Sequence, residues 1–411
     1  MRQFTPLRDL LSLLLPKAGT LLGIYVFLAS TAMATDGDEL IGVGPYSRAM
    51  GGVGIAFSRD VISSVFNNPA TLTTLDGHRF DFAGSILSPR LRASVKSPPP
   101  PNGVGNWSAS SRDRCFPIPA FGFRTPCDIC DDVCFALGAF GITGMGSDYR
   151  NTDPMNTNTN LAVFQFAPAL AYKRGDLSLG ASLTVDYQSA DFGAGESHNY
   201  GYGARVGALY EMGIFAFGAV YTTPRPITHE RIFDFDQDGT FDDFDLELPQ
   251  KAGFGVSCNP SDRFVIETDI KWIDWHGAAG YRDFDWESQW VYAIGAEYRV
   301  TERLKLRAGF NYGPNVVDEH NGWNPAGTRT VQGKTMSTFG YEYFRVIGFP
   351  AIVVRHITCG IGYDVTENFA VNLGLVKGLQ NKIRETSAGG AVELKSSLSE
   401  TFIELGLSWK F

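Results

Sequence analysis

Hydrophobic and polar residues alternate with a period of two over much of the chain. The stretch from Phe264 to Trp272 shows this clearly, because three charged residues, Glu267, Asp269 and Lys271, share one face. Successive side chains of a strand point to opposite faces, so the pattern predicts strands with one apolar and one polar face. The last strand alternates in the same way: Ile403, Leu405, Leu407, Trp409 and Phe411 against Glu404, Gly406, Ser408 and Lys410.

Similar stretches recur along the chain and predict about 14 strands. Short connections such as 173–176 alternate with longer polar segments, among them 88–116, 144–160, 223–245 and 313–350. Short turns at one end and long loops at the other are typical of an outer-membrane barrel. We therefore predict an all-β fold, a transmembrane antiparallel β-barrel. The expected strands are 79–87, 117–125, 134–143, 161–173, 177–188, 201–211, 213–222, 246–257, 264–272, 289–300, 304–311, 351–363, 369–375 and 402–411.

Two other architectures fit the pattern less well. After residue 34 no apolar run approaches the roughly 20 residues that a membrane helix needs. A soluble sandwich or β-helix would bury half of its strand faces in a shared core, and the polar faces here carry too many charges for that. In a bilayer the sheet must close, because unpaired backbone groups are too costly there.

The first 34 residues have the features of a secretory signal peptide. Arg2, Arg8 and Lys17 precede the apolar run 21–28, and Ala32-Met33-Ala34 forms an A-x-A cleavage site. A membrane anchor is the alternative, although the uncharged stretch 18–34 is marginal for a span. Removing residues 1–34, with three basic residues and Asp9, changes the net charge from −9 to −11. The terminal Phe411 resembles the signal read by the barrel-assembly machinery, so we expect the bacterial outer membrane.

Charge and motifs exclude several functions. An acidic chain has no general basic surface for nucleic acid. The sequence contains no G-x-S-x-G, no H-E-x-x-H and no phosphate-binding loop, and its six histidines are scattered. We therefore expect no enzyme and no required cofactor.

Three of the six cysteines are close in sequence, at Cys127, Cys130 and Cys134. An exported protein meets an oxidising compartment, so these three residues are disulfide candidates. Zinc or redox chemistry at Cys127-x-x-Cys130 is the alternative, but it would need a second ligand cluster or a thioredoxin-like pattern.

An acidic loop lies between the seventh and eighth expected strands. Its spacing matches an EF-hand type loop, with Gly239 at the turn and an aspartate in place of the usual final glutamate. The sequence predicts a structural calcium site; a solvated acidic loop is the alternative. The expected ligands are Asp234, Asp236, Asp238, Thr240, Asp242 and Asp245.

The segment 35–78 differs from the barrel strands, because glycines crowd it before Asn67-Asn68-Pro69-Ala70. The run from Tyr46 to Ala56, Asp60 and this Asn-Pro-Ala element resemble the hatch of the FadL/TodX transporters of hydrophobic compounds. Leu246 to Pro249, the run from Lys271 to Trp275 and Gly348 to Ala351 fit the same resemblance.

The resemblance implies a 14-stranded barrel, 79–411, plugged by a hatch, 35–78, and a monomer in outer-membrane lipid. It implies passive transport of long-chain fatty acids or other small hydrophobic molecules through a lateral opening. Asn68, Pro69 and Ala70 are then expected against a kinked third strand near Gly138 to Gly141. The physical reason is that a hydrophobic solute gains nothing from an aqueous pore, whereas an apolar pocket with a side exit releases it into the bilayer.

Capture and binding of the substrate are less well defined. The loop 189–201 is short where the best-known relatives carry a capture groove. The loop 313–350, with Trp323, Phe339, Tyr341, Tyr343 and Phe344, is a substitute collector. Strand parity places four basic residues in the lumen, either to pair a substrate carboxylate or to pair with neighbours such as Glu267 and Asp269. These four are Arg205, Lys271, Lys305 and Arg307.

Two other functions fit a barrel. A general porin for small hydrophilic solutes would need 35–78 to leave the lumen open. A surface adhesin or structural barrel would use the acidic loop and the loop 313–350 to bind a partner.

Overall fold

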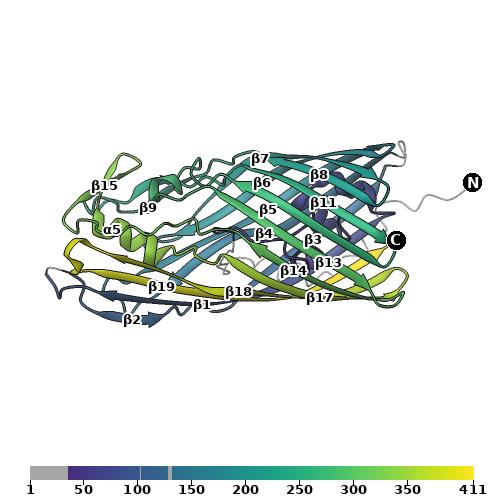
Figure 1. Ribbon diagram of the computed structural model, residues 1–411. Helices are drawn as coiled ribbons and strands as arrows, with labels where there is room; N and C mark the ends of the chain where they lie inside the picture. The colour runs from purple at the N-terminus through teal and green to yellow at the C-terminus, as the bar shows by residue number, and fades with distance from the viewer. Residues whose placement is uncertain (1–35, 102, 128–131) are drawn as a thin grey trace, which may run out of the picture.

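The computed structural model describes residues 36–101, 103–127 and 132–411, and their strands form a closed antiparallel barrel (Figure 1). Strands adjacent in the ring pair in chain order, and β1 pairs with β19 to close it. Within the described residues the ring has 14 strands, which confirms the predicted fold. They are β1 (Arg79–Lys96), β3 (Phe116–Pro126), β4 (Val133–Asp148), β5 (Asn158–Arg174), β6 (Leu177–Asp191), β7 (Ser197–Met212), β8 (Phe215–Thr222), β11 (Lys251–Ser261), β12 (Phe264–Ile273), β13 (Gln289–Arg299), β14 (Leu304–Tyr312), β17 (Arg355–Thr366), β18 (Phe369–Thr386) and β19 (Glu393–Lys410).

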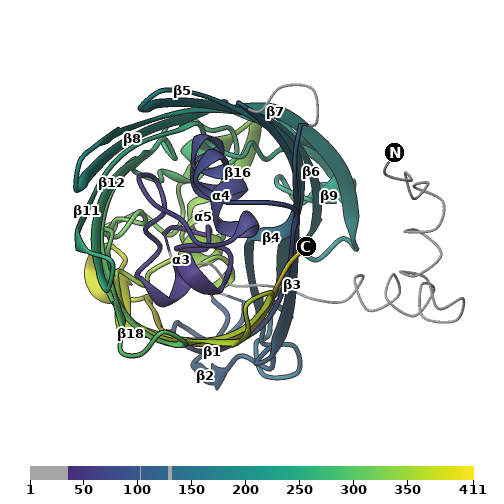
Figure 2. The same cartoon turned by 90° about the vertical axis from the view of Figure 1, so that its right-hand side faces the viewer.

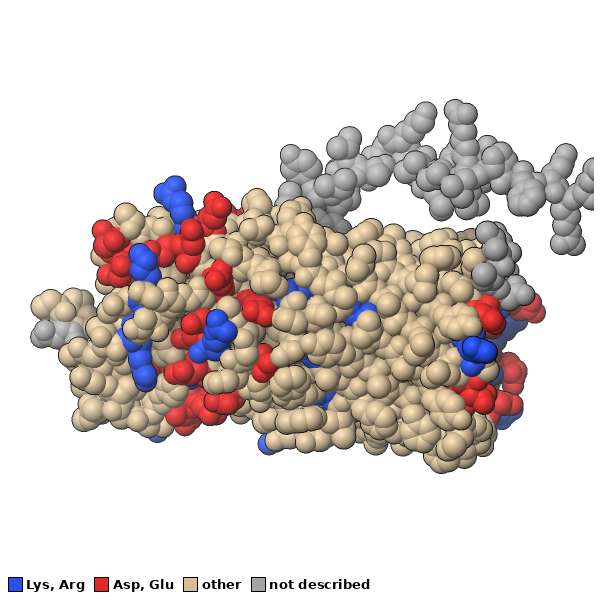
Figure 3. All heavy atoms as spheres, turned by 90° about the horizontal axis from the view of Figure 1, so that it is seen from above, with Lys and Arg blue, Asp and Glu red and all other residues tan. Residues whose placement is uncertain are grey.

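The outer wall is apolar, as the alternation predicted. On β19, Ile403 is 52% exposed and Leu405 49%, whereas Glu404 between them is 1% exposed and faces the lumen. On the face drawn in Figure 3, acidic and basic side chains gather towards the two ends, and the surface between them carries few. This belt is the surface that hydrocarbon chains cover in a bilayer.

The ends of the barrel carry further short elements that the sequence did not predict. The region 246–250 is not part of β11, because Leu248 pairs with Arg225 inside the barrel. Likewise β17 begins only at Arg355, after Pro350. The short elements are β2 (Trp107–Ser110), β9 (Thr228–Phe233), β10 (Asp242–Asp245), η3 (Arg282–Phe284), β15 (Thr328–Val331), β16 (Lys334–Ser337), α5 (Thr338–Tyr343), the π-helical turn η4 (Phe344–Gly348) and η5 (Ala388–Gly390).

The segment that precedes the barrel lies inside it. Seen along the barrel in Figure 2, α3 (Pro45–Ala49) and α4 (Val61–Asn67) lie within the ring of strands. The 3-10 turn η2 (Pro69–Thr74) follows α4 and contacts β5, β6 and β7. None of the described helices has both the length and the apolar character that crossing a membrane requires.

Candidate functional site

The hatch is a compact unit with its own local signals. Asp60 caps α4: its Oδ1 accepts a hydrogen bond from the Ser63 amide at 2.6 Å, and its Oδ2 accepts one from the Tyr46 amide at 3.3 Å. The Val61 amide donates to Asp81 of β1 at 2.7 Å. The cap therefore joins the two hatch helices to each other, and the next residue joins them to the barrel wall.

Two wall carboxylates hold the hatch backbone. Glu267 accepts hydrogen bonds from the amides of Ala56 at 2.7 Å and Phe57 at 3.0 Å. Asp269 accepts from Gly54 at 3.0 Å and Ile55 at 3.3 Å. Hydrogen bonds to charged groups contribute about 1.5–3 kcal/mol each. The carboxylates that β12 presents to the lumen therefore anchor the plug, and both also interact with the charge of Lys271, as the sequence suggested.

The Asn-Pro-Ala element lies against β6 and β7 of the barrel wall. The Asn68 side-chain amide donates to the carbonyl oxygens of Ile55 at 2.7 Å and Ala208 at 3.0 Å. A side chain at Gly180 of β6 would overlap the backbone of Pro69 and Ala70.

The predicted neighbours Gly138 to Gly141 lie on β4, and η2 contacts β4 as well as β5, β6 and β7. Gly138 itself faces Val65 of α4, one turn before the element. Gly141 faces Ile118 of β3.

The four basic residues considered for a substrate carboxylate all have protein partners. Arg205 donates to the Val65 carbonyl at 2.7 Å, and Lys271 donates to the Gly52 carbonyl at 2.7 Å, so both hold the hatch. Lys305 and Arg307 form ion pairs, the first with Asp364 at 2.8 Å and the second with Glu297 at 2.7 Å. Two of the four therefore connect the wall and the plug, and the other two join neighbouring strands of the wall.

The barrel wall is interrupted between β3 and β4. Their ladder ends at the pair Ala120 and Phe140, although both strands continue. From Ala139 to Asp148 almost every residue of β4 is buried, so both faces of this half-strand are covered and it turns into the lumen. The register of β4 against β5 also shifts between Gly141 and Thr143. The predicted gate residue Gly141 thus lies at the start of the break.

The hatch covers the free edge of β4 with its own first residues. The Leu40 amide donates to the Ile142 carbonyl at 3.0 Å, and the Gly144 amide donates to the Asp38 carbonyl at 3.1 Å. Glu39 lies directly opposite Thr143. We call residues 38–40 the gate strand, because they provide the backbone partners that β3 no longer provides. Sequence reasoning missed this pairing, since a three-residue ladder leaves no periodic pattern.

The gate strand is itself held by two buried side-chain contacts. Glu39 forms an ion pair with Lys251 of β11, and Asp38 accepts a hydrogen bond from the Tyr281 hydroxyl. A cavity of about 50 Å³, bordered by Glu39, Lys251 and Arg205, lies beside it. Charged and apolar side chains line this cavity together, and it is large enough for a few water molecules.

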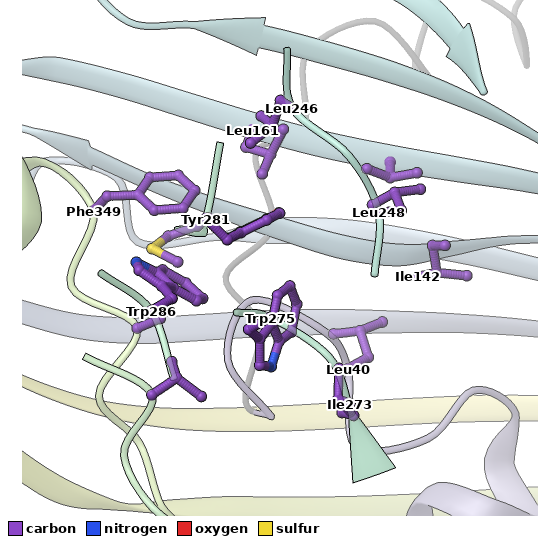
Figure 4. Close-up of a cluster of buried hydrophobic side chains, with 14 of the residues drawn as sticks. Leu40, Ile142, Leu161, Leu246, Leu248, Ile273, Trp275, Tyr281, Trp286 and Phe349 are labelled. Carbon is purple, nitrogen blue, oxygen red and sulfur yellow. The ribbon is translucent and has the colours of Figure 1, made fainter. Parts of the chain in front are cut away.

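Apolar and aromatic side chains fill the lumen on the other side of the gate strand. Figure 4 shows Leu40 and Ile142 continuous with Trp275, Tyr281 and Trp286. The ring centroids of Trp275 and Tyr281 are 4.7 Å apart, and those of Tyr281 and Trp286 are 4.8 Å apart.

The aromatic series continues towards the long loops. Trp286 contacts Phe349, and Phe349 stacks with Phe344 at 5.9 Å between centroids. A cavity lined by side chains of this series, among them Phe192 and Phe349, has a volume of only about 10 Å³. Apolar side chains thus run without a break from the loop end of the lumen to the free edge of β4. We take this apolar series and the gate strand as the candidate functional site.

The loop 313–350 contributes to this interior. Trp323, Tyr341 and Tyr343 are buried, and Phe339 and Phe344 are half-buried. The collecting role of this loop stays a prediction, and in this structure its aromatic side chains belong to the interior. They pack under the loop because α5 and η4 fold back into the mouth of the barrel.

The predicted calcium ligands only partly converge. Carboxylate oxygens of Asp234, Asp236 and Asp242 lie within 4.8 Å of one another. The ammonium of Lys334 lies 2.6 Å from Asp242. Asp238 instead accepts from Thr240 within the turn, which lowers the pKa of Asp238, and Asp245 accepts from Thr228 at 2.6 Å. Calcium binding stays a prediction, with three of the six residues in one place.

The described cysteines carry free thiols. Cys127 lies opposite Val133, so its side chain points to the face opposite that of Cys134. These two candidates are therefore not bonded to each other. Cys130 lies outside the described residues.

Comparisons with known proteins identify the family. The family model "Outer membrane protein transport protein (OMPP1/FadL/TodX)" matches residues 29–223 and 196–324. Its members are transport channels rather than enzymes. No curated protein matches the chain significantly.

Three solved structures share the fold. The toluene transporter TodX of Pseudomonas putida is 19% identical, with 90% of this chain and 99% of that chain covered and a TM-score of 0.65. A FadL homologue of Pseudomonas aeruginosa is 14% identical, with 93% and 100% covered and a TM-score of 0.69. The toluene transporter TbuX of Ralstonia pickettii is 18% identical, with 90% and 99% covered and a TM-score of 0.59. The chain belongs to the outer membrane protein transport protein family (OMPP1/FadL/TodX) and is a β-barrel transporter of the bacterial outer membrane.

Proposed function

We propose that the barrel takes up small, uncharged hydrophobic molecules by passive diffusion and releases them sideways into the membrane between β3 and β4. The observation that carries this proposal is the apolar series from Phe344 to Leu40, which ends at the free edge of β4. Two of the similar structures, TodX and TbuX, are toluene transporters, and a third is a FadL homologue.

The charges inside the barrel favour an uncharged substrate over a fatty-acid carboxylate. Among the described residues near the hatch, Arg48 pairs with Glu404 at 3.1 Å and Arg225 pairs with Asp186 at 3.3 Å. Lys251 pairs with Glu39, and Arg205 and Lys271 hold hatch carbonyls. A fatty-acid carboxylate would have to displace one of these partners. Long-chain fatty acids are the second candidate, because the resemblance to the FadL/TodX transporters implies them and one similar structure is a FadL homologue.

Release requires that the gate strand leave the edge of β4. Among the described residues, two backbone hydrogen bonds join them, one from the Leu40 amide and one to the Asp38 carbonyl. The contacts of Glu39 with Lys251 and of Asp38 with Tyr281 hold the gate strand on its other side. Each net hydrogen bond is worth about 0.5–1.5 kcal/mol, so an opening of this local ladder is thermally accessible. A solute in the apolar series then meets lipid and loses no hydrophobic stabilisation on leaving.

A reversible lock tests the gate. Glu39 and Thr143 lie opposite each other in a non-hydrogen-bonded pair, for which the Cα atoms are about 4.5 Å apart and a disulfide fits. We expect Glu39→Cys/Thr143→Cys, in a chain whose native cysteines are replaced by alanine, to lose uptake of labelled toluene into proteoliposomes when oxidised and to regain it with reductant. The single variants are the controls.

The same vesicles distinguish the substrates. Uptake of toluene above that of oleate supports an uncharged substrate, and the reverse supports the fatty acid. If the oxidised double-cysteine barrel transports toluene as fast as the same barrel after treatment with reductant, the lateral gate is contradicted. Swelling with sugars but no uptake of either hydrophobic probe would indicate a porin.

A further inference from the structure

The outer surface of three neighbouring strands, β18, β19 and β1, carries a group of basic side chains near the long loops. The three strands lie side by side in the wall (Figure 1), and β19 pairs with both of the others. Among the described residues that face outwards here, Glu393 is the one acidic residue. We call the following seven residues the basic patch: Arg90, Arg92, Lys96, Lys377, Lys382, Arg384 and Lys395. In a chain of net charge −9, a surface of this sign indicates an anionic partner.

The charges at the centre of the basic patch are close together. Arg92 of β1 and Lys382 of β18 both lie opposite Ser397 of β19. Neighbouring strands are about 4.8 Å apart, so the Cα atoms of these two basic residues are separated by about 10 Å. In the next outward-facing row Lys395 lies directly opposite Arg384. Like charges directly opposite each other destabilise a sheet, so the fold holds these cations together at a cost.

Protein groups neutralise only part of the basic patch. Glu393 pairs with Lys96 at 3.3 Å and with Arg384 at 2.5 Å. Lys377 donates to the Glu400 carbonyl at 3.1 Å. The other four basic side chains have no side-chain hydrogen bond or ion pair with any described residue; they are Arg90, Arg92, Lys382 and Lys395. The patch therefore keeps most of its positive charge.

The basic patch begins where the apolar belt ends. Near the short turns, the Trp409 ring lies 5.0 Å from that of Phe369 and 5.8 Å from that of Phe80, which resembles the aromatic girdle at a membrane border. Lys377 is eight residues beyond Phe369, and Arg90 is ten beyond Phe80. With a rise of about 3.4 Å per residue and a strand tilt of about 40°, they lie about 20 to 26 Å further along the membrane normal. The apolar band of such barrels is about 25 Å tall, so the patch lies at the level of the lipid head groups on the long-loop side.

We infer that the basic patch binds a phosphorylated membrane lipid of the outer leaflet. Head groups at this level present phosphate oxygens, and arginine and lysine side chains are the usual protein partners of phosphate. Below the patch on the same strands, Ile86 is 49% exposed, Leu375 41% and Ile403 52%, so the acyl chains of the same molecule have an apolar surface to lie on. A soluble anion would use the charges but not this adjoining wall. The inference is independent of what the barrel carries.

The bound lipid has a consequence for the wall itself. A phosphate group between Lys395 and Arg384 neutralises the opposed cations, and Arg92 reaches the same head group from the other side of β19. The Arg384 side chain is 61% exposed, so it is accessible to a head group from outside. One lipid thus joins the last two strands of the barrel to the first across the closing seam.

Binding of lipid A, which is a phosphorylated lipid of the outer leaflet, tests the inference. The full-length barrel is purified in detergent, and its complexes with lipid A and with dephosphorylated lipid A are quantified by native mass spectrometry. We expect the wild type to prefer the phosphorylated form. Arg92→Gln/Lys382→Gln/Arg384→Gln/Lys395→Gln should bind lipid A at least about tenfold more weakly than the wild type, a ratio that corresponds to about 1.4 kcal/mol.

The matched control removes four exposed cations from the short-turn end of the barrel. Arg174→Gln/Arg263→Gln/Arg303→Gln/Lys410→Gln should bind lipid A as the wild type does. Heat-dependent gel migration shows whether each variant folds. If the variant of the patch does not fold, Arg92→Gln/Lys382→Gln, which leaves the opposed pair in place, is measured instead and should also bind more weakly.

Three results would overturn the inference. The first is equal binding of lipid A and its dephosphorylated form by the wild type, because the acyl chains alone would then explain the complex. The second is undiminished binding by a folded variant of the patch. The third is release of lipid A by millimolar inorganic phosphate, which would show that the patch binds a soluble anion.

Discussion

The two sides of the lumen are stabilised in different ways. Around the hatch, wall side chains bind backbone groups at fixed positions, as Glu267 and Asp269 do for residues 54–57. Towards the long loops, Trp275, Trp286 and Phe349 are joined by ring contacts only. Directional bonds fix a plug in one position, whereas apolar contacts are non-directional and a hydrophobic solute can replace them. The polar side thus determines where the plug lies, and the apolar side determines what passes.

The largest effect is expected from removing the polar anchors. Glu267→Ala/Asp269→Ala leaves four hatch amides without acceptors, and each such group costs about 1–3 kcal/mol, so the free energy of unfolding falls by at least about 4 kcal/mol. Urea unfolding in lipid vesicles measures the loss, and sugar-driven swelling measures leakage past the plug. Asp364→Asn, whose pair with Lys305 is partly exposed, is the control. Unchanged stability and no leakage would show that the apolar side holds the plug alone.

A smaller effect is expected on the apolar side. Phe349→Leu removes a ring from a cluster with almost no free volume, which costs about 1 kcal/mol and widens the path. Uptake of a two-ring hydrocarbon should rise relative to toluene in the vesicle assay. Phe310→Leu, on the lipid-facing side of β14, should change neither rate. An unchanged ratio of the two hydrocarbons would mean that the selective constriction lies elsewhere.

The acidic loop provides a weaker test at the outer end. If Asp234, Asp236 and Asp242 bind calcium, calorimetry should give a dissociation constant of about 10⁻⁴ to 10⁻³ M, typical of extracellular sites. Asp236→Asn should weaken binding, whereas Asp243→Asn in the same hairpin should not. No heat at millimolar calcium would show that Lys334 alone neutralises these carboxylates.

The smallest effect concerns Asp274, just after β12. Although burial opposes its ionisation, hydrogen bonds from Gln250 at 2.8 Å and Ser288 at 2.8 Å lower its pKa below the ordinary value of 3.8. Because the pKa of Asp274 is lower in the folded protein than in the unfolded chain, its ionisation stabilises the loop at every pH above the ordinary pKa. This stabilisation is lost as the pH falls through the pKa of the folded protein. Amide exchange of residues 274–288 should therefore increase in acid, and less so in Asp274→Asn. Equal acid sensitivity in both would exclude Asp274 as the cause.

The sequence predicted the barrel well and its interior poorly. Alternation of two faces is a local property, so the lipid-facing residues of β19 and the buried charges of β12 were both predictable from spacing. Several contacts between the hatch and the wall join residues more than 200 positions apart, as the Ala56–Glu267 contact does. No spacing rule encodes such pairs. Asn68, Pro69 and Ala70 were correctly taken as hatch residues by resemblance, but their neighbours on β6 could only be known from the folded chain.

The long seam between β1 and β19 has a consequence for biogenesis. It runs from the pair Arg79 and Lys410 to the pair Lys96 and Glu393, and it joins the first barrel strand to the last. The segment that fills the interior comes earlier in the chain than either strand. The hatch is bound to both strands of this seam, through the Val61 amide to Asp81 of β1 and through Arg48 to Glu404 of β19, so closure of the seam brings the two strands that hold the plug together around it.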